Sequence, residues 1–154
     1  MSESVRFVFP KPKLAKLLQQ PGGLPVAEAL ERAQNNLEAI KPTCLAELQA
    51  LLELTEARFE AMGGEFEEAP LAELYAIAVR GIGGGEVCGT PGVDQALTSL
   101  CDLLDNLRTS QRYDRAAIGV HVQAWRLLLA PENSLEASRV VVEGLRKVSA
   151  RYAA

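Results

Sequence analysis

His121 is the residue of this chain whose type most directly suggests chemistry, because it is the sole histidine among 154 residues. An imidazole titrates near neutral pH and can carry a phosphoryl group, which raises the hypothesis of histidine phosphotransfer. At about 100° per residue, His121 falls between Trp125 and Leu128, on the most apolar arc of its expected helix. A phosphoacceptor must be reachable by a partner's active site. We therefore expect a structural, at least half-buried His121 and keep phosphotransfer as the alternative.

The other residues that carry chemistry do not form a recognisable site. Cys44, Cys88 and Cys101 show no CxxC spacing, and they lie far in sequence from His121. Neither a disulfide framework nor a structural zinc site is expected from this pattern. Acyl transfer by a serine or cysteine needs a histidine base, and the single histidine is expected to be enclosed. We predict no metal, no cofactor and no enzymatic activity.

A glycine cluster between Gly81 and Gly92 superficially suggests a phosphate-binding loop. A Walker loop continues with Lys-Ser or Lys-Thr after its last glycine, and this cluster does not. A dinucleotide loop follows a strand, whereas a helix is expected before Gly81. The cluster therefore predicts a helix C-cap followed by a flexible connection.

The elements that would position these residues are helical. Apolar residues make up 48% of the chain and recur at spacings of three and four, while aromatic residues are only 5%. This pattern favours amphipathic helices and a core of Leu, Ala and Val. We predict an all-α, compact bundle of about five helices in a single domain at 24–154. The helices are expected at Val26–Met62, Pro70–Gly81, Gly92–Thr109, Tyr113–Ala130 and Asn133–Tyr152.

The first expected helix is long and contains Pro42. A proline inside a helix costs about 3 kcal/mol, because it removes one hydrogen bond and crowds a carbonyl group. The apolar stripe keeps its phase across Pro42, which favours one kinked helix. The alternative is a break at Lys41, with Thr43 opening a second helix. Such a long helix could also pair with itself, so a structural homo-oligomer stays open.

The fourth expected helix, Tyr113–Ala130, is apolar around most of its circumference. A helix of this kind is surrounded by other elements in a folded protein. We therefore expect it at the centre of the bundle, with Pro131 ending it.

Residues 1–23 form a basic, proline-broken arm in front of the bundle. Arg6 and three lysines stand against the single acid Glu3, although the whole chain has a net charge of −4. We interpret the arm as a partly extended docking segment that becomes ordered on a partner. The equal alternative is an arm folded back over its own bundle. The residues predicted to bind a partner are Phe7, Phe9, Lys11, Lys13 and Lys16.

Charge and hydropathy bear on the cell compartment and on other partners. The acidic net charge argues against nucleic-acid binding by the body of the protein. No apolar run reaches about 18 residues, so no membrane span is predicted. The first residues lack the apolar core of a secretory signal, and the cytoplasm is the expected location.

Two runs in the first half of the chain carry a family resemblance. KPKLAKLLQQPGG, from Lys11 to Gly23, is followed by LPVAEALERAQNNLEAIKPTCLAEL, from Leu24 to Leu48. This region resembles the N-terminal part of CheE-type proteins, which are small helical proteins encoded in alphaproteobacterial chemotaxis gene clusters. The resemblance implies a non-enzymatic accessory or regulatory part in chemotaxis signalling. It carries over no active-site residue.

Taken together, these patterns predict a cytoplasmic interaction module that contacts a signalling protein through its basic arm. The alternatives are a histidine phosphotransfer domain using His121 and a structural homo-oligomer.

Overall fold

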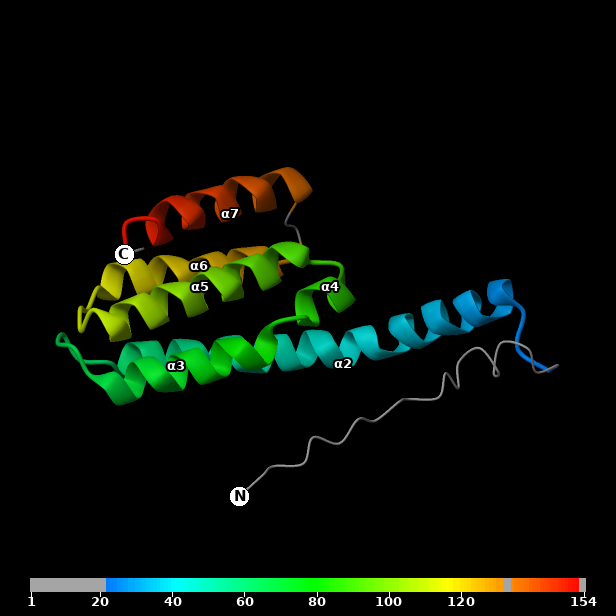
Figure 1. The fold of residues 1–154 in the computed structure, drawn as a ribbon, viewed down its shortest axis with the longest axis horizontal. Coiled ribbons are helices and arrows are strands. Elements are labelled where there is room, and N and C mark those ends of the chain that lie inside the picture. Colours follow the sequence, from blue (N-terminus) through cyan, green and yellow to red (C-terminus); the bar gives the residue numbers. More distant parts are fainter. Residues whose placement is uncertain (1–21, 132–133, 153–154) are drawn as a thin grey trace, which may run out of the picture. The chain divides into compact units, whose positions relative to one another are not determined.

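The structure is a computed structural model that describes residues 22–131 and 134–152 (Figure 1). The chain divides into two compact units, Met1–Asn36 and Leu37–Ala154, and the boundary falls inside the first helix. The predicted arm lies almost entirely outside the described residues. The described helices are α2 (Val26–Ala61), α3 (Glu68–Gly81), α4 (Gly84–Cys88), α5 (Pro91–Thr109), α6 (Arg115–Leu129) and α7 (Leu135–Ser149).

The all-α bundle is confirmed, and five of the helices lie within a few residues of their predicted bounds. α2 is one continuous helix of 36 residues with Pro42 inside it, so the alternative break at Lys41 is wrong. The helix begins after Pro25, whose carbonyl oxygen accepts the Ala29 N–H at 2.9 Å. Proline is well tolerated at such a start, because the first turn has no partner for its amides.

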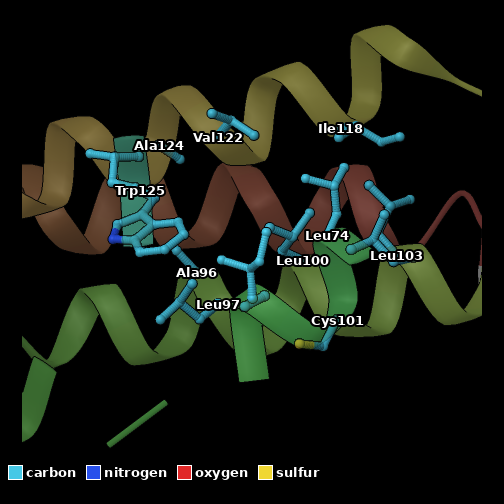
Figure 2. Packing of buried hydrophobic residues seen from close by; sticks show 14 of the residues in the cluster. Leu74, Ala96, Leu97, Leu100, Cys101, Leu103, Ile118, Val122, Ala124 and Trp125 are labelled. Carbon is cyan, nitrogen blue, oxygen red and sulfur yellow. The ribbon is translucent and has the colours of Figure 1, made fainter. Parts of the chain in front are cut away.

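The core of the second unit is rich in leucine, and Figure 2 shows leucine side chains of α3 and α5 meeting Ile118, Val122 and Trp125 of α6. α5 packs against α3, α4, α6 and α7. Its inner face is fully buried, with Leu97, Leu103 and Leu104 each 0% exposed. Burying a leucine side chain contributes about 1.5–3 kcal/mol, so this row of residues dominates the stability of the bundle.

α6, the helix that we predicted to be central, buries eight of its residues, including Ile118, Val122 and Trp125. It shares the interior with α5. Two of its apolar residues lie outside the core instead, because Val120 is 47% exposed and Leu127 is 58% exposed. The sequence of α6 is thus apolar nearly all round because apolar residues also lie on the side of the helix that faces solvent.

The glycine cluster does not form the flexible connection that we expected. Residues Gly84–Cys88 form the short helix α4, flanked by Gly83 at φ +94° and Gly89 at φ +77°. Both glycines adopt the left-handed region, which residues with a Cβ adopt only at a cost. The glycines therefore serve to turn the chain tightly into and out of one short helix between α3 and α5.

Side-chain caps fix the starts of the last two helices. Asp114 accepts the Ala117 N–H at 2.9 Å in front of α6, and Ser134 accepts the Ala137 N–H at 3.1 Å in front of α7. These caps satisfy amides that lack a partner in the first turn. Asn133, where the last helix was predicted to begin, lies outside the described residues.

Candidate functional site

His121 lies in the core of the second unit and is 1% exposed. Its Nδ1 atom lies 2.9 Å from the carbonyl oxygen of Ala117, one turn earlier in α6. A carbonyl only accepts hydrogen bonds, so Nδ1 carries the proton and donates it. Burial lowers the pKa of His121 below 6.5, and the hydrogen bond to Ala117 opposes this effect in part. The imidazole is therefore neutral at physiological pH, with Nε2 as the acceptor.

Two serine hydroxyl groups complete this cluster. Ser99 Oγ lies 3.0 Å from His121 Nε2, and Ser149 Oγ lies 3.2 Å from the same nitrogen. The two hydroxyls are themselves 2.8 Å apart. Since Ser99 is on α5, His121 on α6 and Ser149 at the end of α7, the cluster ties three helices together at one level. We call Ser99, His121 and Ser149 the histidine cluster.

Ser99 and Ser149 also line a groove of about 580 Å³. A serine within reach of an oriented histidine resembles the nucleophile and base of covalent catalysis. In that chemistry the histidine must return its proton to a leaving group, so it needs access to the substrate. An imidazole that is 1% exposed and lies behind both hydroxyls lacks this access. The arrangement is suited to a hydrogen-bonded junction between helices.

The same burial bears on phosphotransfer. Both ring nitrogens of His121 are within hydrogen-bonding distance of protein atoms, so neither is presented to a partner. Phosphorylation would require the histidine cluster to break and the ring to leave the core. This geometry gives no support to the phosphotransfer alternative and agrees with a structural histidine.

The start of α4 binds an anion, and that anion is a side chain of the protein itself. The Asp94 carboxylate accepts three backbone N–H groups, from the N-cap residue Gly83 at 2.9 Å and from the first turn of α4, Gly85 at 3.0 Å and Glu86 at 2.8 Å. Backbone amides that converge in this way form a concave anion-binding nest. Because Asp94 fills the nest, a phosphate group would have to displace it.

The cysteines are not arranged for nucleophilic or metal chemistry. Burial raises the pKa of the Cys88 thiol, and Cys44, Asp94 and Lys41 modify it to a lesser extent, the last in the opposite direction. Burial also raises the pKa of Cys101 to about 11. Protonated thiols are poor nucleophiles and poor metal ligands. Within residues 22–131 and 134–152, no group of three or more His, Cys, Asp or Glu side chains could hold a metal ion.

The most unusual surface lies along the first part of α2. Large apolar side chains remain exposed there, at 76% for Val26, 66% for Leu30, 43% for Leu37 and 47% for Ile40. The intervening Ala33 is exposed as well, and Cys44 is half-buried. These six residues repeat at alternating spacings of four and three, so they share one side of the helix. We call them the α2 face: Val26, Leu30, Ala33, Leu37, Ile40 and Cys44.

Farther along α2, the same spacing continues into the core. Leu48 and Leu51 are each 2% exposed, and Thr55 is 0% exposed. The hydroxyl group of Thr55 donates to the Leu51 carbonyl at 2.8 Å, which satisfies it inside the bundle. The sequence thus builds one apolar stripe along α2, of which the later part is covered by the bundle and the earlier part is not.

A second apolar surface lies between α6 and α7. A groove of about 590 Å³ is lined there by aliphatic side chains of both helices, together with Gly119, Gly144 and Gln123. Val120, Leu127 and Val140 are the most exposed of its large residues. Nothing in the surrounding residues indicates what would occupy this groove.

The predicted partner-binding residues Phe7, Phe9, Lys11, Lys13 and Lys16 lie outside the described residues. Their role stays a prediction. Ser99, Ser149 and Asp94 were not predicted from the sequence, because they acquire their roles only through tertiary contacts. No local motif marks the two serines. The position of Asp94 shortly after a glycine cluster is the single signal that could have pointed to its role.

Comparisons of the chain with protein-family models, with curated proteins and with solved structures gave no match. Among the described helices, none is both long enough and apolar enough to cross a membrane.

Proposed function

We propose that this protein is a non-enzymatic interaction module whose contact surface is the α2 face. The observation that carries the proposal is the exposure of Val26 and Leu30, which are 76% and 66% exposed within a strictly periodic stripe. Single exposed apolar residues are ordinary, but a contiguous apolar patch usually marks an interaction site. Amphipathic helices commonly bind through anchors at this spacing.

Helix stability gives a second argument. Helices shorter than about 12–15 residues are marginal in water, and most helical stability in proteins comes from packing of an apolar face. The first part of α2 holds its turns with exposed ion pairs such as Arg32–Glu28 at 2.6 Å. Pairs of this type contribute only about 0.3–0.5 kcal/mol. A partner helix on the α2 face would supply the missing packing.

The cellular setting of the proposal comes from the resemblance to CheE-type proteins, which covers the arm and the first part of α2. We propose an accessory or regulatory role in bacterial chemotaxis signalling, in the cytoplasm. In this scheme the bundle from Leu37 onward is a stable scaffold. The basic arm at residues 1–23 adds a second contact to the same signalling partner.

Pull-down from a native lysate tests the proposed function. We expect the double variant Leu30→Asp, Leu37→Asp to lose the proteins that the wild-type chain captures, because two charges cannot be buried in an apolar contact. Asn35→Asp is the matched control, since Asn35 is exposed on the opposite side of α2. A chain lacking residues before Gly23 measures the contribution of the arm. Equal capture by the wild type and the double variant would overturn the proposal.

A further inference from the structure

We propose that Cys44 and Cys88 are a redox-responsive pair, which closes a disulfide bond between α2 and α4 when the chain meets a low-molecular-weight disulfide. This modification site is independent of the partner contact proposed above. Both cysteines belong to the second unit, Leu37–Ala154, and both are free thiols in the structure.

The first argument is a direct contact between Cys88 and α2. Cys88 is the last residue of α4, and its Sγ atom lies 3.9 Å from the carbonyl oxygen of Lys41. A helix carbonyl points along the axis toward the residues three and four positions later, so this oxygen lies beside the backbone of Cys44. The thiol of Cys88 therefore rests on the turn of α2 that carries Cys44.

The register of the two helices brings the same two residues together (Figure 1). A Cβ on Gly84 would lie 3.1 Å from Cδ2 of Leu48, so the start of α4 packs closely on α2 at that leucine. Cys88 lies one turn after Gly84 in α4, and Cys44 lies one turn before Leu48 in α2. Residues four apart share one side of a helix, so the pair Gly84 and Cys88 faces the pair Leu48 and Cys44.

Gly84 matters for the distance between the two backbones. A disulfide bond requires Cα atoms about 4.4–6.8 Å apart, which is closer than most helix pairs allow. Because Gly84 has no side chain, the backbone of α4 can approach α2 at this level. The close approach at Gly84 brings Cys88, one turn farther on, within reach of Cys44.

The chemical surroundings of the thiols agree with this geometry. Burial is the main cause that raises the pKa of Cys88, and the next is the neighbouring Cys44, an effect that requires the two sulfur atoms to lie near each other. Both residues are only half-buried, so a small reagent can reach the pair. Cys101 is buried instead, and burial raises its pKa to about 11, so it serves as an unreactive reference.

The bond forms in two exchange steps. The thiolate of one cysteine attacks the small disulfide, forms a mixed disulfide and releases one small thiolate. The thiolate of the second cysteine then attacks the mixed disulfide and releases the other small thiolate. In total, two protein thiols lose two protons and two electrons, and one small disulfide becomes two small thiols. Each step needs one thiolate at a time, so the raised pKa of Cys88 slows the exchange without preventing it.

The bond would fasten the connection between α3 and α5 to α2. It would close a loop that contains the last part of α2 and all of α3. Such a cross-link stabilises the folded chain, because it restricts the unfolded one. In a reducing compartment the pair stays as two thiols, and the bond forms when small disulfides accumulate.

The first test is the state of the cysteines after the reduced full-length chain is incubated with oxidised glutathione at about pH 8.5, where an ordinary thiol is half ionised. We expect the intact mass to fall by two hydrogens, and digestion without reduction to yield peptides joined through Cys44 and Cys88. Cys44→Ser and Cys88→Ser should each stop at a glutathione adduct on the remaining cysteine of the pair. Cys101→Ala is the matched control and should keep the bond.

The second test is thermal unfolding of the oxidised and the reduced chain. The oxidised chain should unfold at a temperature higher by roughly 5–15 °C, and added reductant should reverse this shift. Cys88→Ser after the same treatment should show no such rise. The comparison separates a bond that fits the folded protein from one that forms only in the unfolded chain.

The inference is overturned by a wild-type chain that keeps three free thiols, or by glutathione adducts at Cys44 and Cys88 that never resolve into a bond. Bonds to Cys101 or between two chains, in place of Cys44–Cys88, would overturn it as well. A Cys44–Cys88 bond that lowers the unfolding temperature would show that the cysteines meet only after α4 has left its place on α2, and this result too would overturn the inference.

Discussion

Leu37 and Leu51 lie two heptads apart on the same stripe of α2, yet Leu37 is 43% exposed and Leu51 is 2% exposed. The same residue type at equivalent positions thus has two roles in one helix. Leu51 contributes to the fold, and Leu37 contributes to a surface that the bundle leaves uncovered.

Substitution by alanine separates these two roles. Leu51→Ala should lower the free energy of unfolding by about 2–5 kcal/mol, because it opens a cavity in the core. Leu37→Ala should change it by less than about 0.5 kcal/mol, since little packing is lost at an exposed site. Urea unfolding of dilute protein, followed by the fluorescence of the single buried Trp125, measures both values. Equal losses for the two variants would show that the bundle covers Leu37 in solution.

The histidine cluster should make stability depend on pH. Burial lowers the pKa of His121 in the folded protein below 6.5, so the unfolded chain binds the proton more readily. The stabilisation is therefore complete above about pH 6.5 and is lost as the pH falls from there through the folded pKa. Urea unfolding at several pH values between about 8 and 5 should show this decline.

His121→Leu provides the control for that prediction. It should remove the decline below about pH 6.5, and it should cost about 1–3 kcal/mol at neutral pH because Ser99 and Ser149 lose their acceptor. A decline of the same size in wild type and variant would assign the pH dependence to other groups.

The hydrogen bonds between the Asp94 carboxylate and the start of α4 should be essential for the connection between α3 and α5. Asp94→Ala leaves three backbone N–H groups without their carboxylate, and we expect a loss of about 1–3 kcal/mol or more. Gly85→Ala should be comparably damaging, because a Cβ there would lie 2.7 Å from the Thr90 carbonyl oxygen. Gly64→Ala is the matched control, since nothing lies within 4 Å of its Cβ position. Thermal unfolding measures the three stabilities. A loss of stability in Gly64→Ala as large as in Asp94→Ala and Gly85→Ala would contradict this account.

Asp114 joins the start of α6 to the turn that follows α7, because its carboxylate accepts the Tyr152 hydroxyl as well as the Ala117 N–H. The Tyr152 hydrogen bond is the main cause that lowers the pKa of Asp114 below 3.8. This stabilisation is present above pH about 3.8 and is lost as the pH falls through the folded pKa.

Tyr152→Phe should therefore cost about 1 kcal/mol at neutral pH and should flatten the acid limb of the stability curve. Asp114→Ala should cost about 0.5–2 kcal/mol more, since it also removes the cap of α6. Unfolding free energies measured at several acidic pH values compare the two variants with the wild type. An unchanged acid limb in Tyr152→Phe would show that the tyrosine does not hold the carboxylate.

Sequence periodicity was sufficient to predict the five long helices and the buried position of His121. The stripe from Leu30 to Leu51 keeps one phase, and the wheel of α6 places His121 on its apolar arc, so local spacing alone carried both predictions. The same spacing could not show where the stripe leaves the core. Exposed and buried heptad leucines are identical in sequence, and only tertiary packing distinguishes Leu37 from Leu51.

The parts of the site that sequence reasoning missed depend on contacts between distant segments. Ser99 and Ser149 are 50 residues apart and meet only when α5 and α7 pack together. Four of the five residues of α4 have weak helix propensity, and the carboxylate of Asp94 stabilises this helix from the neighbouring α5. The glycines of this cluster led to the prediction of a flexible connection, which concealed the short helix between Gly83 and Gly89.

The central claim is that the α2 face is the surface through which the chain contacts a partner. Hydrogen exchange of the backbone amides at residues 30–41, measured with and without the proteins that the chain captures from a native lysate, tests it most directly. We predict slow exchange in the complex and fast exchange in the free chain, while the amides of α5 stay protected throughout. Exchange at residues 30–41 that is the same with and without the captured proteins would contradict the claim.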